Sequence, residues 1–184
     1  MGEFSNSPFI IQGDLFMKSK KVYPLNLKKK ETILWERNEL LIATAYIFDN
    51  KSQCIRMVKN TIKDIIQDNM VYILIKPLYD ELSYKKEFGS LDCEITDSYC
   101  IIKGNKDTID DIFKKVFKFW GELCRFQFFI SQFCNTDILN IIREFSKKYR
   151  NSYKLYYKLA MQCVAIISDT GDGEEFEIIT KLDT

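Results

Sequence analysis

The sequence predicts a single α+β domain over residues 1–184, in which about three helices pack on a largely antiparallel sheet. Three segments repeat apolar residues at helical spacing, and the segments between them are short apolar or alternating runs that predict strands. Glycine, asparagine and aspartate separate several of these runs, which favours tight turns over long crossovers. A chain of 184 residues with 46% hydrophobic and 29% charged residues can bury a core without disulfides or metals.

Two strands are expected before the first helix. Residues 8–18 predict a strand with a bend at Gly13 and Asp14. Residues 32–48 end in the apolar run LLIATAYIF, which predicts a buried strand. The lysine-rich segment 18–30, with one proline, lies between them and is typical of a solvated sheet edge or loop.

The first helix is expected to have Ser52 as its N-cap. Its apolar face consists of Ile55, Val58, Ile62, Ile65 and Ile66. Residues 70–79 then predict a strand that ends near Pro77, because proline has no N–H for a strand ladder. Residues 80–89 are expected to be a charged connection.

Residues 91–103 predict a hairpin whose turn is centred on Thr96–Asp97 or on Asp97–Ser98. The first of these turns would place Cys93 opposite Cys100, where the two thiols could oxidise. Cysteines of this kind act in a reducing cytosol as small apolar residues, which is the interpretation we favour.

Residues 108–130 form the most apolar and aromatic stretch of the chain. Asp107 and Thr108 are expected to cap a helix whose first turn carries acidic residues and which ends at Gly121. The helix face consists of Ile109, Ile112, Phe113, Val116, Phe117 and Trp120. Beyond the glycine, Cys124, Phe126, Phe128 and Ile130 alternate with other residues and predict a strand buried on one face. A helix continuing from Gly121 to Phe133 is the alternative, and in either case the stretch is core rather than a binding surface.

The last third predicts one helix and a hairpin. Asn135, Thr136 and Asp137 form a cap for a helix whose apolar positions are 138, 141, 142, 145 and 149. Residues 159–167 and 175–182 are expected to be strands, joined by the glycine-containing segment 168–174.

The composition excludes several kinds of chemistry. The chain has no histidine, which removes Ser-His-Asp and Cys-His catalysis and histidine-ligated zinc. It has no glycine-rich phosphate-binding motif and no C-x-x-C pair, and Cys124 and Cys163 lie in apolar runs without a base. We therefore expect a non-enzymatic protein without cofactor or metal. No leader-like or membrane-spanning run is present, so the expected location is the cytoplasm.

The sharpest polar feature is an acidic hairpin near the C-terminus. Its candidate partner-binding residues are Asp169, Asp172, Glu174, Glu175 and Glu177. They lack the spacing of a calcium loop, and no lysine follows any of them two residues on, as a magnesium-dependent nuclease motif would require. The pattern favours a solvated turn, then an acidic surface that docks a basic partner, and last a metal site.

The expected function is that of a non-catalytic protein that binds another macromolecule. Its concrete form is a small bacterial immunity protein or inhibitor, which neutralises a toxin or a defence protein. The partner would be a basic protein, for example a toxin or a nuclease, that meets the acidic hairpin. The sequence predicts no membrane contact and does not determine whether the chain forms homo-oligomers.

The alternative is a nucleic-acid or nucleotide binder. It would use Lys28 to Lys30 or the basic residues between positions 143 and 158. A net charge of +1 makes this alternative less favoured, because dedicated duplex-binding proteins are usually basic overall.

Overall fold

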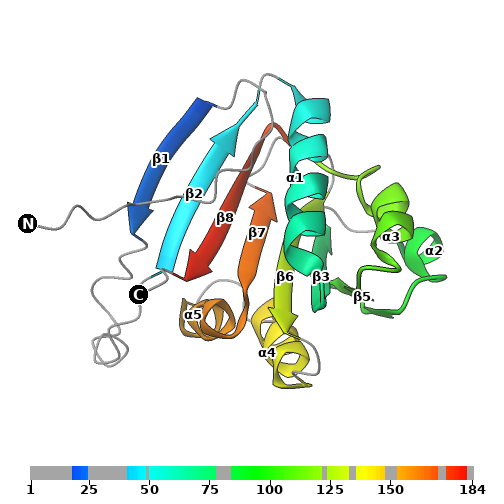
Figure 1. Cartoon of the computed structure of the whole chain (residues 1–184). Coiled ribbons are helices and arrows are strands. Elements are labelled where there is room, and N and C mark those ends of the chain that lie inside the picture. The colour runs from blue at the N-terminus through cyan, green and yellow to red at the C-terminus, as the bar shows by residue number, and fades with distance from the viewer. Residues whose placement is uncertain are drawn as a thin grey trace, which may run out of the picture.

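The computed structural model describes residues 18–24, 41–48, 50–77, 84–121, 124–132, 136–147, 153–169 and 173–181. Eight strands form one sheet in the order β1-β2-β8-β7-β6-β3-β5-β4 (Figure 1). Every neighbouring pair in this order is antiparallel. The predicted α+β class with a largely antiparallel sheet is therefore confirmed.

The elements follow the chain with few long connections between them. The strands are β1 (Lys18–Pro24), β2 (Leu41–Ile47), β3 (Asn69–Pro77), β4 (Cys93–Ile95), β5 (Cys100–Gly104), β6 (Cys124–Gln132), β7 (Ala165–Asp169) and β8 (Glu175–Lys181). The helices are α1 (Lys51–Ile66), α2 (Tyr84–Phe88), α3 (Ile109–Val116), α4 (Thr136–Lys147) and α5 (Tyr153–Gln162). The strand expected at residues 8–18 lies outside the described residues, apart from its last position. The basic segment that follows begins as β1, at the sheet edge.

Helices cover both faces of the sheet. Residues of α1, α2 and α3 share one buried cluster with every second residue of β3 and β6, for example Val71, Ile73 and Phe128. Residues of α4 and α5 share a second cluster with the intervening residues, for example Leu74 and Phe129. Because successive side chains of a strand point to opposite faces, the central strands are buried on both sides.

Helix α1 has the predicted apolar face but a different cap. Val58, Ile62 and Ile66 are fully buried against the sheet. The side chain of Asn50 accepts a hydrogen bond from the backbone N–H of Gln53 at 3.0 Å, so Asn50 and not Ser52 is the N-cap. Asparagine serves this position as well as serine does, and the extended backbone of Asn50 starts the helix two residues earlier.

The β4–β5 hairpin uses the second of the two predicted turns. Ile95 lies opposite Cys100, and the turn is centred on Asp97 and Ser98. Thr96 closes it, because its hydroxyl oxygen accepts from the backbone N–H groups of Ser98 and Tyr99. Cys93 therefore lies opposite Ile102 and not opposite Cys100.

The aromatic stretch folds as a helix followed by a strand, and the continuous-helix alternative is wrong. The predicted face of α3 is buried as far as Trp120, and Gly121 adopts a φ of 68° before β6 begins. Phe129 is fully buried on the opposite face of β6 from Phe128, so this strand is not buried on one face only. Before α3, the side-chain oxygen of Asn105 accepts a hydrogen bond from the backbone N–H of Thr108. The side chain of Thr108 itself makes no capping hydrogen bond.

Two short helices were not expected. Residues 84–88 form α2 inside the segment expected to be a charged connection, and Phe88 anchors it in the core. Residues 153–162 form α5, where we expected the strand to begin at Leu159. Leu159 and Ala160 are buried in this helix. A continuous apolar run does not distinguish a buried helix turn from a strand, and Leu, Ala, Met and Gln favour the helix.

Trp120 fixes the β7–β8 hairpin to the connection between α3 and β6. Its side chain is fully buried, and its indole Nε1 donates to the carbonyl oxygen of Gly173 at 3.0 Å. Its ring stacks on Phe126, with centroids 5.7 Å apart. Gly173 has a φ of 84°, and a Cβ at this position would lie 2.8 Å from the Cα of Gly121. Two glycine backbones thus approach each other where no side chain fits.

We predict that Gly173→Ala destabilises the fold by about 1–3 kcal/mol, because the new methyl group is strained by the positive φ and collides with backbone. Urea unfolding followed by circular dichroism measures this loss. The matched control is Glu174→Ala at the neighbouring exposed position, which we expect to cost less than about 1 kcal/mol. Equal losses for the two variants would show that the Gly173 contact is not a constraint.

Candidate functional site

Polar and charged side chains cross four neighbouring strands on the sheet face that carries α4 and α5. We name this set the polar strip; its members are Lys76, Arg125, Gln127, Ser168, Glu175 and Glu177. Gln127 lies opposite Ser168, which lies opposite Glu177, so these side chains share one face. Figure 1 shows α4 and α5 near the end of the sheet where β6 and β8 finish. Arg125 is exposed and Gln127, Ser168 and Glu177 are partly exposed, so the strip is accessible.

The basic end of the polar strip is formed by Lys76 on β3 and Arg125 on β6. The two residues lie directly opposite each other in the β3–β6 ladder. The Nζ of Lys76 donates to the carbonyl oxygen of Ser146 at 2.8 Å and lies 5.8 Å from the ring centre of Phe145. Burial lowers the pKa of Lys76 to about 8. The ammonium group is thus held against α4 instead of extending into water.

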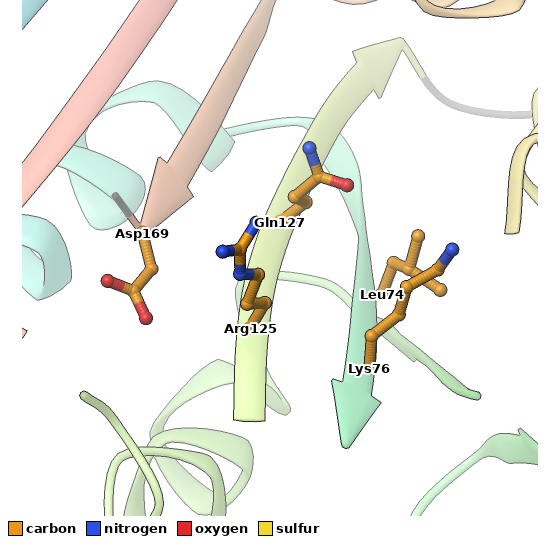
Figure 2. Close-up of a pocket in the computed structure, with 5 residues that line it drawn as sticks. All are labelled: Leu74, Lys76, Arg125, Gln127 and Asp169. Carbon is orange, nitrogen blue, oxygen red and sulfur yellow. The ribbon is translucent and has the colours of Figure 1, made fainter. Parts of the chain in front are cut away.

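A small pocket opens beside this pair. Its lining residues are Leu74, Lys76, Arg125, Gln127 and Asp169, from three neighbouring strands. Figure 2 shows Arg125 between Asp169 on one side and Lys76 on the other. The pocket volume is about 50 Å³. Pockets for drug-sized ligands occupy roughly 300–1,000 Å³, so this one accepts a single functional group.

The acidic end of the polar strip lies on β8. Glu175 and Glu177 are two residues apart, which places both on the same sheet face, and each is partly exposed. Burial raises the pKa of Glu177. Glu174 is exposed, and its backbone carbonyl accepts from the N–H of Phe48 at 3.0 Å.

The remaining acidic candidates lie apart from these. Asp169 is only 8% exposed, at the end of β7, where it lines the pocket. Asp172 lies outside the described residues. Of the five acidic residues, Glu175 and Glu177 share one face of β8, and Asp169 lines the pocket beside the basic pair. Their partner-binding role stays a prediction.

Next to Lys76, an ion pair joins β4 to α4. Arg143 binds one carboxylate oxygen of Glu94 through both Nε and Nη2, each at 2.7 Å, and the hydroxyl of Tyr99 donates to the other oxygen at 3.2 Å. The hydrogen bond from Arg143 is the main cause that holds the pKa of Glu94 below its ordinary value. Arg143, which belongs to the basic block expected between 143 and 158, is therefore committed to a structural contact.

The structure describes only some of the basic residues that a nucleic-acid or nucleotide binder would use. Lys28 to Lys30, Lys148 and Arg150 lie outside the described residues. Lys147 on α4 and Lys154 and Lys158 on α5 are exposed.

Burial makes two of the described thiols weak acids. Burial raises the pKa of Cys163 to about 12, which leaves it protonated and inert as a nucleophile. Cys93 donates to the carbonyl oxygen of Phe88 at 3.3 Å, and its pKa is raised, chiefly by burial. The structure does not describe the side chain of Cys124.

Within the described ranges, no group of three or more Cys, Asp or Glu side chains is placed to hold a metal ion. None of the helices in that part of the chain has the length and apolar character needed to cross a bilayer. Comparison with known protein families, curated proteins and solved structures gives no match to this chain.

The sequence pattern singles out Glu175 and Glu177 as candidates, a role that stays a prediction, but it does not single out Lys76 or Arg125. Lys76 and Arg125 are 49 positions apart, and only the β3–β6 pairing brings them together. One feature of the sequence could have indicated the basic end. Arg125 alternates with Phe residues in a predicted strand, and a charged side chain at such a position indicates an exposed face.

We predict that Glu94→Gln lowers the free energy of unfolding by about 1 kcal/mol at pH 7, since both partners are partly exposed. The folded-state pKa of Glu94 is lowered, so its contribution is present above its ordinary pKa of 4.5 and is lost as pH falls through the folded value. The difference between variant and wild type should therefore shrink steadily below about pH 4.

Urea unfolding at a series of pH values measures the Glu94 effect. Asp111→Asn is the matched control, because its ion pair with Lys114 is highly exposed and should change the free energy of unfolding far less than Glu94→Gln does. A Glu94→Gln effect that does not change with pH would exclude the ion pair as its cause.

Proposed function

We propose that this protein acts without catalysis, by binding another macromolecule through the polar strip. The observation that carries the proposal is the arrangement of charge along the strip, basic at Lys76 and Arg125 and acidic at Glu175 and Glu177. The pocket beside the basic pair holds one functional group and not a whole metabolite. A surface of this kind suits a large partner whose own side chains reach the strip.

The particular protein we propose is a cytosolic inhibitor: an immunity protein that neutralises a toxin, or a factor that blocks a defence protein. An inhibitor of this class needs a stable scaffold and a charged surface complementary to its target. Glu174 and Glu175 would face a basic groove or active site, for example that of a nuclease. Complementary charge accelerates encounter and rejects partners of like charge.

The runner-up is a nucleic-acid binder that uses the helices. Its supporting observation is the exposure of Lys147, Lys154 and Lys158 on α4 and α5. Binding through phosphate contacts weakens steeply as salt is added, because bound counterions are released from the nucleic acid. A captured nucleic acid with this salt dependence would favour the runner-up.

We predict that the double variant Glu174→Lys and Glu175→Lys binds the protein partner more slowly than wild type does. Wild type serves as bait in an extract of the native host, and the bound protein is identified by mass spectrometry. With that protein purified, the double variant should associate about tenfold more slowly at low salt. The wild-type rate should fall with added salt, and the variant rate should not.

The matched control is Asp68→Lys with Asp107→Lys. Both residues are exposed. Asp68 precedes β3 and Asp107 follows β5, so both lie near the end of β3 that is distant from Lys76. This variant makes the same change in net charge and should bind as wild type does. A second readout is inhibition of the partner's own activity by wild type. If both double variants bind equally well, Glu174 and Glu175 are not part of the contact surface.

A further inference from the structure

Two cysteines meet on one face of the β4–β5 hairpin. Cys93 lies opposite Ile102 and Ile95 lies opposite Cys100, so the two cysteines are diagonal neighbours whose side chains share a face. Cys100 belongs to the buried cluster that α1, α2 and α3 form with the sheet, and Cys93 packs against that cluster. A hydrogen bond joins the two thiols. The hairpin thus holds two free cysteines in contact with each other.

The direction of the hydrogen bonds gives the two thiols different roles. A thiol has one proton to donate, and Cys93 donates it to the carbonyl oxygen of Phe88 at 3.3 Å. Cys100 is therefore the donor in the bond between the thiols, and its S–H group is directed at the Cys93 sulfur. Cys93 is partly exposed, whereas Cys100 is fully buried. A small oxidant in solution therefore reaches Cys93 first, and Cys100 lies in position to react with it next.

Closing a disulfide here requires only a small movement of β4. Diagonal neighbours in an antiparallel ladder have Cα atoms about 7–8 Å apart, whereas a disulfide spans about 4.4–6.8 Å, so the strand must shift by about 1 Å. β4 has three residues and is the last strand in the sheet order, so this shift disturbs one ladder only. The carbonyl oxygen of Phe88 loses the thiol donor but still accepts from the N–H of Leu91 at 2.8 Å. Oxidation therefore leaves this carbonyl with a partner.

The acidity of Cys93 determines how fast it reacts. Burial raises its pKa, and the carboxylate of Asp92 adds to this effect. The hydrogen bond from Cys100 and the cation of Lys115 act in the opposite direction but do not outweigh burial. Because only the thiolate attacks a disulfide, little of Cys93 is reactive at pH 7. The pair therefore responds to sustained and not to brief exposure to an oxidant.

We propose that Cys93 and Cys100 form a reversible disulfide by exchange with a low-molecular-weight disulfide. The Cys93 thiolate attacks one sulfur of the oxidant, which forms a mixed disulfide and releases one thiol. The Cys100 thiolate then attacks the Cys93 sulfur, which forms the bond between the two cysteines and releases the second thiol. Two protein thiols are thus oxidised, one oxidant disulfide is reduced, and the two protons leave on the released thiols. This inference does not depend on the proposed function.

The test uses the reduced full chain, incubated without denaturant at about pH 8.5 with oxidised glutathione, because a higher pH supplies more thiolate. The sample is quenched with acid, and the remaining thiols are alkylated. A protease that cleaves after glutamate then separates the two cysteines at Glu94. Mass spectrometry should find peptides that contain Cys93 and Cys100 linked by a disulfide, and dithiothreitol should remove the link.

Three variants separate the roles of the cysteines. Cys100→Ala should retain glutathione on Cys93, because the second attack is missing. Cys93→Ser should lower disulfide formation at Cys100 about tenfold, because Cys100 is buried. The matched control is Cys163→Ala, which removes a thiol from the cluster on the opposite face of the sheet. This control should form the linked peptides as wild type does.

Oxidised wild type should also unfold at a urea concentration about 1 M higher than the reduced protein, since the disulfide constrains the unfolded chain. A native chain that stays reduced after prolonged incubation overturns the pairing, and so does a link from Cys93 to a different cysteine. Glutathione that remains on Cys93 of wild type overturns the role of Cys100. If Cys100→Ala does not fold, wild type and Cys93→Ser still decide between these results. A urea midpoint that does not rise on oxidation shows that closure strains the hairpin, which overturns the small movement of β4 and with it the proposal.

Discussion

The buried indole of Trp120 is the contact on which the rest of the structure depends. It follows α3, precedes β6, and donates its one N–H to Gly173 in the β7–β8 turn. A buried carbonyl oxygen left without a donor costs about 1–3 kcal/mol. The hydrogen bond therefore keeps the segment after α3 in contact with the β7–β8 turn. The close approach of Gly173 to Gly121 makes the same junction intolerant of any larger side chain.

This junction also determines the geometry of the polar strip. Trp120 stacks on Phe126, which fixes the register of β6 against the helices of one face. Since strand side chains alternate, fixing Phe126 inward places Arg125 and Gln127 on the opposite face. The same indole holds the turn that leads into Glu174 and Glu175. A slip of one residue in β6 would bury Arg125 and expose Phe126, so the core and the strip are specified together.

The sequence predicts the parts of this fold that depend on local pattern. The amphipathic faces of α1 and α3, the glycine break and the strand after it all follow from spacing and are confirmed. The start of α5 could not be predicted in the same way, because Leu159 and Ala160 suit either a helix or a strand until the partners on the sheet are known. The basic end of the strip is harder still. Lys76 and Arg125 meet only through the pairing of β3 with β6, and one sequence contains no direct signal of strand pairing.

The pKa shifts divide the charged groups into two kinds. In some, a contact stabilises the charged form, and in others burial destabilises it. Glu87, Glu94 and Asp111 have lowered pKa values, chiefly because lysine or arginine hydrogen-bonds to each carboxylate, and such shifts add to stability. The pKa of Lys76 is lowered and the pKa of Glu177 is raised, because burial disfavours the charged form of each group. Both of these groups belong to the polar strip. A partner that brings charges of opposite sign to these two groups would favour their charged forms and return both pKa values toward their ordinary ranges.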